Sequence, residues 1–309
     1  MMLTDRRVNR CTQKASQASP AHIMPAKEKG FFIAIDSDGC VFDTMEIKHK
    51  ECFCPAAIKH FHLQAVSRYA RETWEFVNLY SRQRGTNRFP ALVSVLDFLR
   101  VRPEVIVRSA AVPELVALRH WIGEGPKLDN PALHQAALCN PALKVVLDWS
   151  AEVNERVADM VHGVPPFPTV RHGLERASSQ ADMIVSSGTP LAALHREWKE
   201  HGLAGYVRRI AGQEDGTKTQ HLTAAAQGRY PPDRILMVGD APGDLRAARN
   251  VNAFFFPILP GREEDSWQQF CDEALDRFLS GCYGGSYQES LIATLEGTLP
   301  VQPPWTRAT

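Results

Sequence analysis

Four short apolar runs constrain the fold of this chain more than any other feature of its sequence. They do not alternate between apolar and polar residues, which is typical of parallel strands covered by helices on both faces. Helical patterns follow the second and third runs, and strand followed by helix predicts an α/β core with a doubly wound (Rossmann-like) parallel sheet. The four runs are FFIAI (Phe31 to Ile35), DMIVS (Asp182 to Ser186), RILMVG (Arg234 to Gly239) and AFFF (Ala253 to Phe256).

Between the first and second runs the apolar spacing becomes helical. Three stripes at helical spacing lie within residues 63–77, 92–99 and 143–160, and the proline-rich segment GVPPFP at 163–168 marks the end of this region. We therefore expect an all-α domain inserted into the core. The expected organisation is an N-terminal tail at 1–30, the core at 31–43 and 166–282, the helical insert at 44–165 and a C-terminal extension at 283–309.

The composition is that of an ordinary globular protein. Lys and Arg together number 35, as do Asp and Glu, and this balance gives no support for binding to nucleic acid or to a membrane surface. No apolar run approaches the roughly 18 to 20 residues that a membrane helix needs. The seven scattered cysteines favour reduced thiols, so we expect a cytoplasmic protein.

The first 30 residues are polar and basic, and they lack the apolar segment of a secretory signal. We interpret them as a disordered tail. Two alternatives stay open, namely a transit peptide and a translation start at Met24.

Two aspartates, Asp36 and Asp38, stand one residue apart directly behind the first apolar run. A carboxylate at the end of a buried strand is held rigidly and can act as a nucleophile, which makes Asp36 the candidate. Asp38 points to the same side and can move a proton to a leaving oxygen and from an attacking water. Gly39 permits a backbone turn close to a substrate.

Groups suited to a phosphoryl ligand follow the second run. The hydroxyl of Ser186 can donate to a phosphoryl oxygen, and the backbone N–H groups of Ser187 and Gly188 can do the same. Further along, Lys218 in the segment GTKTQ is a point charge that can neutralise charge building on a transferred phosphoryl group.

Two more carboxylates, Asp240 and Asp244, lie in MVGDAPGD at the end of the third run. They are placed where they could hold a hard cation. Mg²⁺ prefers oxygen ligands, usually one or two carboxylates together with water and substrate phosphate. The sequence therefore predicts a magnesium site at this edge of the sheet.

In the order and placement of these residues the chain resembles the haloacid dehalogenase-like hydrolase superfamily. The resemblance implies that Asp36 attacks phosphorus to form an aspartyl-phosphate and that Asp38 is the general acid and base. It also implies that Mg²⁺ is held by the Asp36 carboxylate, the Asp38 carbonyl and Asp240, with Asp244 bonding directly or through water. The matching motifs are Asp36-Ser37-Asp38-Gly39, Ser186, Lys218, and Gly239-Asp240 with Asp244.

The second aspartate of the first motif separates the reactions within that superfamily. Members that break carbon–halogen bonds lack it, and phosphonoacetaldehyde hydrolases typically carry a small residue there. The presence of Asp38 favours phosphate monoester chemistry, and the interpretation that we adopt is hydrolysis of a small phosphorylated metabolite. Two alternatives remain, a phosphosugar mutase that uses the same aspartate pair and a non-catalytic protein that binds a phosphorylated ligand.

The helical insert stands where this superfamily places a mobile cap over the active site, and at about 120 residues it looks larger than the usual cap. Within it, Arg84 and Arg88 lie in the connection LYSRQRGTNRFP. One interpretation is an anion-binding loop that contacts substrate, since guanidinium groups match phosphate or carboxylate at two points. The other is a solvated charged connection. We expect a monomer or a homodimer.

Overall fold

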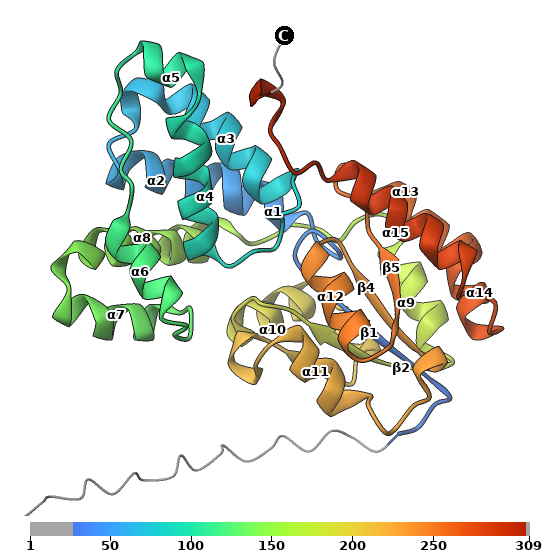
Figure 1. The fold of residues 1–309 in the computed structure, drawn as a ribbon. Helices are drawn as coiled ribbons and strands as arrows, with labels where there is room; N and C mark the ends of the chain where they lie inside the picture. Colours follow the sequence, from blue (N-terminus) through green and yellow to red (C-terminus); the bar gives the residue numbers. More distant parts are fainter. Residues whose placement is uncertain (1–26, 307–309) are drawn as a thin grey trace, which may run out of the picture.

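The computed structural model describes residues 27–306, and a five-stranded parallel sheet forms the centre of its α/β part (Figure 1). The strand order β3-β2-β1-β4-β5 is doubly wound, which confirms the predicted fold class. All four predicted strands are present to within one residue at each end, whereas β3 was not predicted, because its three residues are too few to form an apolar run. The strands are β1 (Phe31–Ile35), β2 (Ala181–Ser186), β3 (Arg209–Ala211), β4 (Ile235–Gly239) and β5 (Phe254–Pro257).

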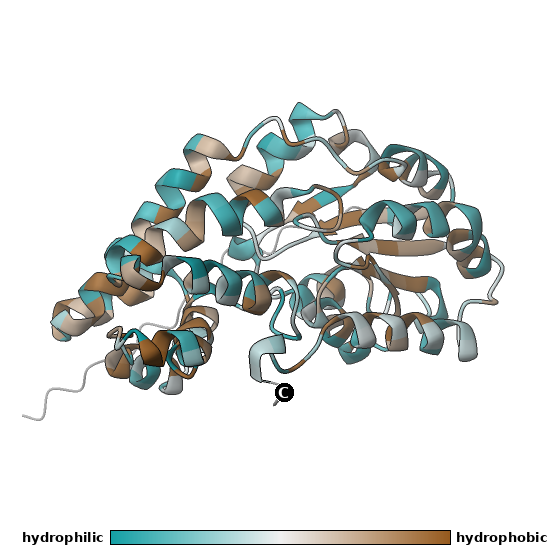
Figure 2. Cartoon of the chain, turned by 90° about the horizontal axis from the view of Figure 1, so that it is seen from above, coloured by the Kyte–Doolittle hydropathy of each residue, from teal (hydrophilic) through white to brown (hydrophobic). Residues whose placement is uncertain are grey.

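Helices cover both faces of the sheet because its strands are apolar on both sides (Figure 2). In β1, Ile33 and Ile35 face one layer, while Phe32 and Ala34 face the other. The first layer contains α9 (Val170–Ser178), α10 (Leu191–Glu200), α13 (Glu263–Gln269), η7 (Phe270–Ala274) and α14 (Leu275–Leu279). The second contains α11 (Lys218–Ala225) and α12 (Pro242–Asn250), and α15 (Ser286–Thr298) contributes to both. Short turns are η4 (Ala204–Tyr206), η5 (Gln213–Asp215) and η6 (Pro232–Arg234).

The inserted region, residues 44–165, is helical and has an apolar core of its own; we call it the cap. The three predicted stripes fall on α3, α4 and α8, with Trp74 and Trp149 packed at the centre, their ring centroids 6.1 Å apart. Its elements are α1 (Thr44–Ile47), η1 (Lys48–Phe53), α2 (Cys54–His60), η2 (Gln64–Val66), α3 (Ser67–Leu79), α4 (Arg88–Arg100), α5 (Pro103–Val107), α6 (Val116–Gly123), α7 (Asn130–Cys139), η3 (Pro141–Leu143) and α8 (Lys144–Met160).

The segment after α15 runs from the core to the cap, as Figure 1 shows. The backbone N–H of Arg82 in the cap donates to the carbonyl of Pro300, and the turn η8 (Pro304–Thr306) carries Trp305 onto α3. There the Trp305 ring stacks edge-on against Phe76 at 5.7 Å and lies 4.2 Å from the guanidinium carbon of Arg102. The C-terminal segment thus connects the two apolar cores.

Most of the predicted N-terminal tail lies outside the described residues. Of its last residues, Glu28 and Lys29 donate backbone N–H groups to the carboxylate of Asp182. None of the cysteines between residues 27 and 306 forms a disulfide. Over that same range, every helix is too short or too polar to cross a membrane.

Candidate active site

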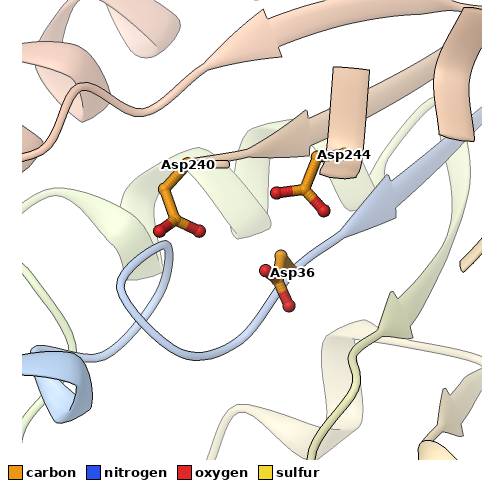
Figure 3. A group of neighbouring side chains, drawn as sticks. All are labelled: Asp36, Asp240 and Asp244. Carbon is orange, nitrogen blue, oxygen red and sulfur yellow. The ribbon is translucent and has the colours of Figure 1, made fainter. Parts of the chain in front are cut away.

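Three aspartates meet at the carboxyl ends of β1 and β4 (Figure 3). Asp36 directly follows β1 and continues its alternation, so its side chain turns towards the layer that holds α11 and α12. Asp240 directly follows β4, and Asp244 lies on the first turn of α12. Gly239 makes this approach possible, because a Cβ there would lie 2.4 Å from Cγ of Asp244.

The three carboxylates fit a hard divalent cation. They are buried, and each offers an oxygen atom within 4.8 Å of the others. The oxygen Oδ1 of Asp240 is buried and has no hydrogen-bond partner among the described residues. Such an oxygen is costly unless it binds something, and a carboxylate oxygen suits Mg²⁺. Three of the expected magnesium ligands, Asp36, Asp240 and Asp244, therefore lie together, and they have the right donor type.

Lys218, the first residue of α11, lies between two of these acids. Its Nζ is 2.5 Å from Oδ2 of Asp36 and 2.5 Å from Oδ1 of Asp244. Burial raises the pKa of both carboxyl groups to about 6, although Lys218 opposes the rise. Burial lowers the pKa of Lys218, but Asp244 and Asp36 outweigh it, so this pKa lies well above its ordinary value. The lysine is a fixed positive charge beside the proposed nucleophile.

Asp38 is held away from that cluster by three side chains. Its Oδ1 accepts hydrogen bonds from Thr44 and Lys48, and its Oδ2 accepts one from Thr189, each at 2.5 Å. Burial raises the pKa of Asp38, but the charge of Lys48 and the hydrogen bonds from all three groups outweigh it and lower the pKa to about 2. Asp38 is therefore a carboxylate at neutral pH in this arrangement.

Sequence reasoning missed these partners of Asp38. Thr189 directly follows Ser187 and Gly188, which the sequence analysis named, so a hydroxyl near the strand end was a usable signal. Lys48 begins η1 in the cap, and nothing in its sequence context distinguishes it from a surface lysine. Only the packing of the cap on the core brings it to Asp38.

A further acid, Glu197 on α10, lies beside the first motif and was also missed. It accepts a hydrogen bond from the hydroxyl of Ser37 at 3.1 Å, and Trp198 donates to the same hydroxyl at 3.0 Å. Burial and the charge of Asp38 raise the pKa of Glu197 to about 7. These contacts hold the side chain of Ser37, which stands between Asp36 and Asp38.

Ser186 ends β2 and is fully buried on the same side of the sheet as Asp36. Its Oγ lies 3.0 Å from Nδ1 of His221, one turn after Lys218 on α11. Burial lowers the pKa of His221 to about 4, so the imidazole is neutral at pH 7. Nothing in the sequence analysis singled out His221, so this contact was not predicted.

Of the two expected backbone donors, Ser187 needs correction, and the expectation for Gly188 stays a prediction. The N–H of Ser187 donates to the carbonyl of Ala211 at 3.1 Å, so it is occupied by the sheet edge rather than free for phosphate. Gly188 is exposed and has open space on its Cβ side. Gly39 makes the predicted turn, with φ of +72°, and its N–H donates to the carbonyl of Phe42.

The two cap arginines behave differently from each other. Arg84 is buried and forms an ion pair with Asp240, so the interpretation of its loop as a solvated connection is wrong for this residue. Arg88 donates instead to Ser150 and Asn154 on α8 and lies 5.0 Å from the Phe53 ring, which places it within the cap. Burial lowers the pKa of Arg88 to about 10.

The matches to this chain come from the comparison with solved structures. No protein-family model matches the sequence, and no curated protein matches it. A solved structure of a predicted phosphoglycolate phosphatase from Haemophilus somnus is 13% identical, with 73% of this chain and 84% of that chain aligned at a TM-score of 0.46.

Two further structures are described as haloacid dehalogenase-like family hydrolases. The one from Streptococcus pneumoniae is 14% identical, aligns over 79% of this chain and 91% of its own, and has a TM-score of 0.38. The one from Xanthomonas campestris is 10% identical, aligns over 84% of this chain and 97% of its own, and has a TM-score of 0.42. At these identities and TM-scores the matches say nothing about the activity of this chain.

Proposed function

We propose that this protein is a Mg²⁺-dependent phosphatase of the haloacid dehalogenase-like type that hydrolyses a small phosphorylated metabolite. The observation that carries the proposal is the meeting of Asp36, Asp240, Asp244 and Lys218 at one edge of the sheet. A group of three buried acids with one lysine is costly for a purely structural purpose. It is useful where a cation and a phosphoryl group must be held beside a nucleophile.

Each residue has a role that follows from its position. An oxygen of Asp36 attacks phosphorus, and the bond from phosphorus to the ester oxygen breaks as the aspartyl-phosphate forms. Lys218, already at Asp36, offsets the charge on the phosphoryl oxygens. Asp36, Asp240 and Asp244 would hold Mg²⁺, which neutralises the developing negative charge. Ser186, at the end of the adjacent strand β2, is suited to contact the phosphoryl group.

Asp38 would act as the general acid in the first step and as the general base in the second. As a carboxylate it can take a proton from the water that attacks the aspartyl-phosphate, and the bond between phosphorus and the Asp36 oxygen breaks to release inorganic phosphate and restore the Asp36 carboxylate. To protonate the leaving oxygen in the first step it must first acquire a proton, which the bond from Lys48 opposes. Movement of the cap, which carries Lys48, would relieve that opposition.

A phosphate-release assay with a panel of sugar phosphates, nucleotides and phosphorylated acids tests the proposal, with Mg²⁺ or EDTA and with Asp36→Asn. Asp148→Asn, which changes a half-buried aspartate on α8 that pairs with Lys144, is the matched control. We expect Mg²⁺-dependent release from a few compounds, retained in Asp148→Asn and lost in Asp36→Asn.

Three outcomes would contradict it. Activity in Asp36→Asn equal to that of the wild type would exclude Asp36 as the nucleophile. Isomerised sugar phosphate without free phosphate would indicate a mutase. Binding of a phosphorylated compound and Mg²⁺ without turnover would indicate a binding protein.

A further inference from the structure

We propose that Arg84 of the cap is a positioning residue for the metal site, because it holds one oxygen of Asp240 so that the other faces the cation. The inference rests on the proposed function, since it concerns the same magnesium site. It means that the metal site of the core is completed by a residue of the cap.

The contact between Arg84 and Asp240 is short and enclosed. Nε of Arg84 lies 2.5 Å from Oδ2 of Asp240, and the side chains are 3% and 2% exposed. Nη1 of the same guanidinium donates to the carbonyl of Leu79 at the end of α3, at 2.9 Å. The rigid, planar group is therefore anchored to the cap at one nitrogen and to the core at another.

The two oxygens of Asp240 are used unequally. Oδ2 accepts from Arg84, whereas Oδ1 is buried and has no hydrogen-bond partner within residues 27–306. Asp240 also belongs to the cluster with Asp36 and Asp244 whose oxygens lie within 4.8 Å of one another. A carboxylate that is tied down through one oxygen presents the other in a fixed direction. Hydrogen-bond partners of this kind orient the ligands of metal ions.

Two glycines leave room for the loop between α3 and α4 of the cap to approach Asp240. At Gly39, with φ of +72°, a Cβ would lie 2.4 Å from Nη2 of Arg84 and 2.8 Å from Oδ2 of Asp240. At Gly85, with φ of +73°, a Cβ would lie 2.8 Å from Cβ of Ala241. The loop between α3 and α4 thus sits directly on the loops that follow β1 and β4. Withdrawal of the cap would remove Arg84 from Asp240.

A direct metal-binding measurement tests this inference. Mn²⁺, which shares the oxygen-ligand preference of Mg²⁺, is added to the purified full chain, and the free ion is quantified by its EPR signal. We expect wild type to bind Mn²⁺, Arg84→Met to bind it about tenfold more weakly or worse, and Arg84→Lys to fall between them.

Arg82→Met is the matched control, because Arg82 lies in the same loop but donates to the carbonyls of Leu299 and Glu296. It should bind Mn²⁺ like wild type. Circular dichroism in EDTA identifies any variant that fails to fold. If Arg84→Met does not fold, Arg84→Lys tests the inference in its place.

Unchanged or tighter Mn²⁺ binding in Arg84→Met and Arg84→Lys would overturn the inference and leave the phosphatase proposal standing. Tighter binding in particular would mean that the guanidinium repels the cation. A wild-type chain that binds neither Mn²⁺ nor Mg²⁺ would overturn both.

Discussion

The ammonium nitrogen of Lys48 lies 2.5 Å from Oδ1 of Asp38, and this ion pair joins the first turn of the cap helices to the first motif of the core. The two side chains are only 11% and 14% exposed. Lys48 is the second cation that the cap contributes to the acidic edge of the core, after Arg84, which pairs with Asp240. The cap therefore supplies positive charge to the site as well as a cover.

Replacement of Lys48 by methionine should impair substrate binding more than the chemical step. It removes one positive charge from the acidic edge of the core, which weakens the attraction of the site for a phosphate dianion. We expect kcat/KM for the best compound of the phosphate-release panel to fall about tenfold, mainly through KM. Steady-state kinetics measure both constants.

Lys50→Met is the control for this prediction. Lys50 is two residues away and pairs with Glu46 and Glu75 instead of Asp38, so its loss should leave both constants near the wild-type values. A wild-type kcat/KM in Lys48→Met would show that the ion pair has no part in binding.

Replacement of His221 should act through Ser186. In the tautomer with a proton on Nδ1, the neutral imidazole donates to Oγ of Ser186 and leaves the serine O–H free for a phosphoryl oxygen. Nε2 of His221 has no partner within the described part of the chain, but the ring borders a cavity of about 30 Å³, which can hold one water molecule.

We expect His221→Phe to lower kcat/KM about tenfold, because it removes the hydrogen bond that orients the hydroxyl of Ser186 towards the substrate. His221→Asn, whose amide can replace Nδ1, should retain more activity. Equal losses in the two variants would point to packing rather than to the hydrogen bond. Thermal unfolding of both proteins separates loss of activity from loss of stability.

Much of the fold was predictable because it depends on local patterns. The apolar runs of β1, β2, β4 and β5 and the helical stripes of the cap are visible in single stretches of sequence. The three residues of β3 carry no such pattern, since that strand forms at the sheet edge through its pairing with β2. The crossing of the C-terminal segment to the cap likewise has no local signature.

The same distinction applies to the site. Asp36 and Asp240 follow strands directly, and parallel strands end at a common edge, so their proximity follows from the topology. Arg84 and His221 acquire their partners through contacts between elements distant in sequence, and Lys48 reaches Asp38 from the next helical segment, ten residues along the chain. No spacing in the chain encodes those contacts, and they required the three-dimensional structure.

Trp305 should stabilise the attachment of the C-terminal segment to the cap. Its contacts with the Phe76 ring and the Arg102 guanidinium predict that Trp305→Ala lowers the free energy of unfolding by about 1 to 2 kcal/mol. Trp305→Phe, which keeps a ring, should lose less. Urea unfolding measures the difference, and identical midpoints for the three proteins would mean that the segment does not hold the cap.

Asp182 should make stability depend on pH, far from the catalytic edge. It lies in β2, is 4% exposed, and accepts hydrogen bonds from the Tyr230 hydroxyl, the Arg208 guanidinium and the backbone N–H groups of Glu28 and Lys29. Burial raises the pKa of Asp182, but these hydrogen bonds outweigh it and lower the pKa from 3.8 to about 2.

Because the pKa of Asp182 is lower in the folded state, the carboxylate stabilises the fold at any pH above its unfolded value of 3.8, and this contribution is lost as the pH falls towards about 2. At pH 7 we expect Asp182→Asn to reduce the free energy of unfolding by about 2 kcal/mol. Urea unfolding of wild type and variant at a series of pH values should show a constant difference down to about pH 5 that narrows below pH 4. Asp148→Asn, on the surface of the cap, should match wild type throughout. A difference for Asp182→Asn that stays constant into the acid range would mean that lost packing, and not the charge of Asp182, is responsible.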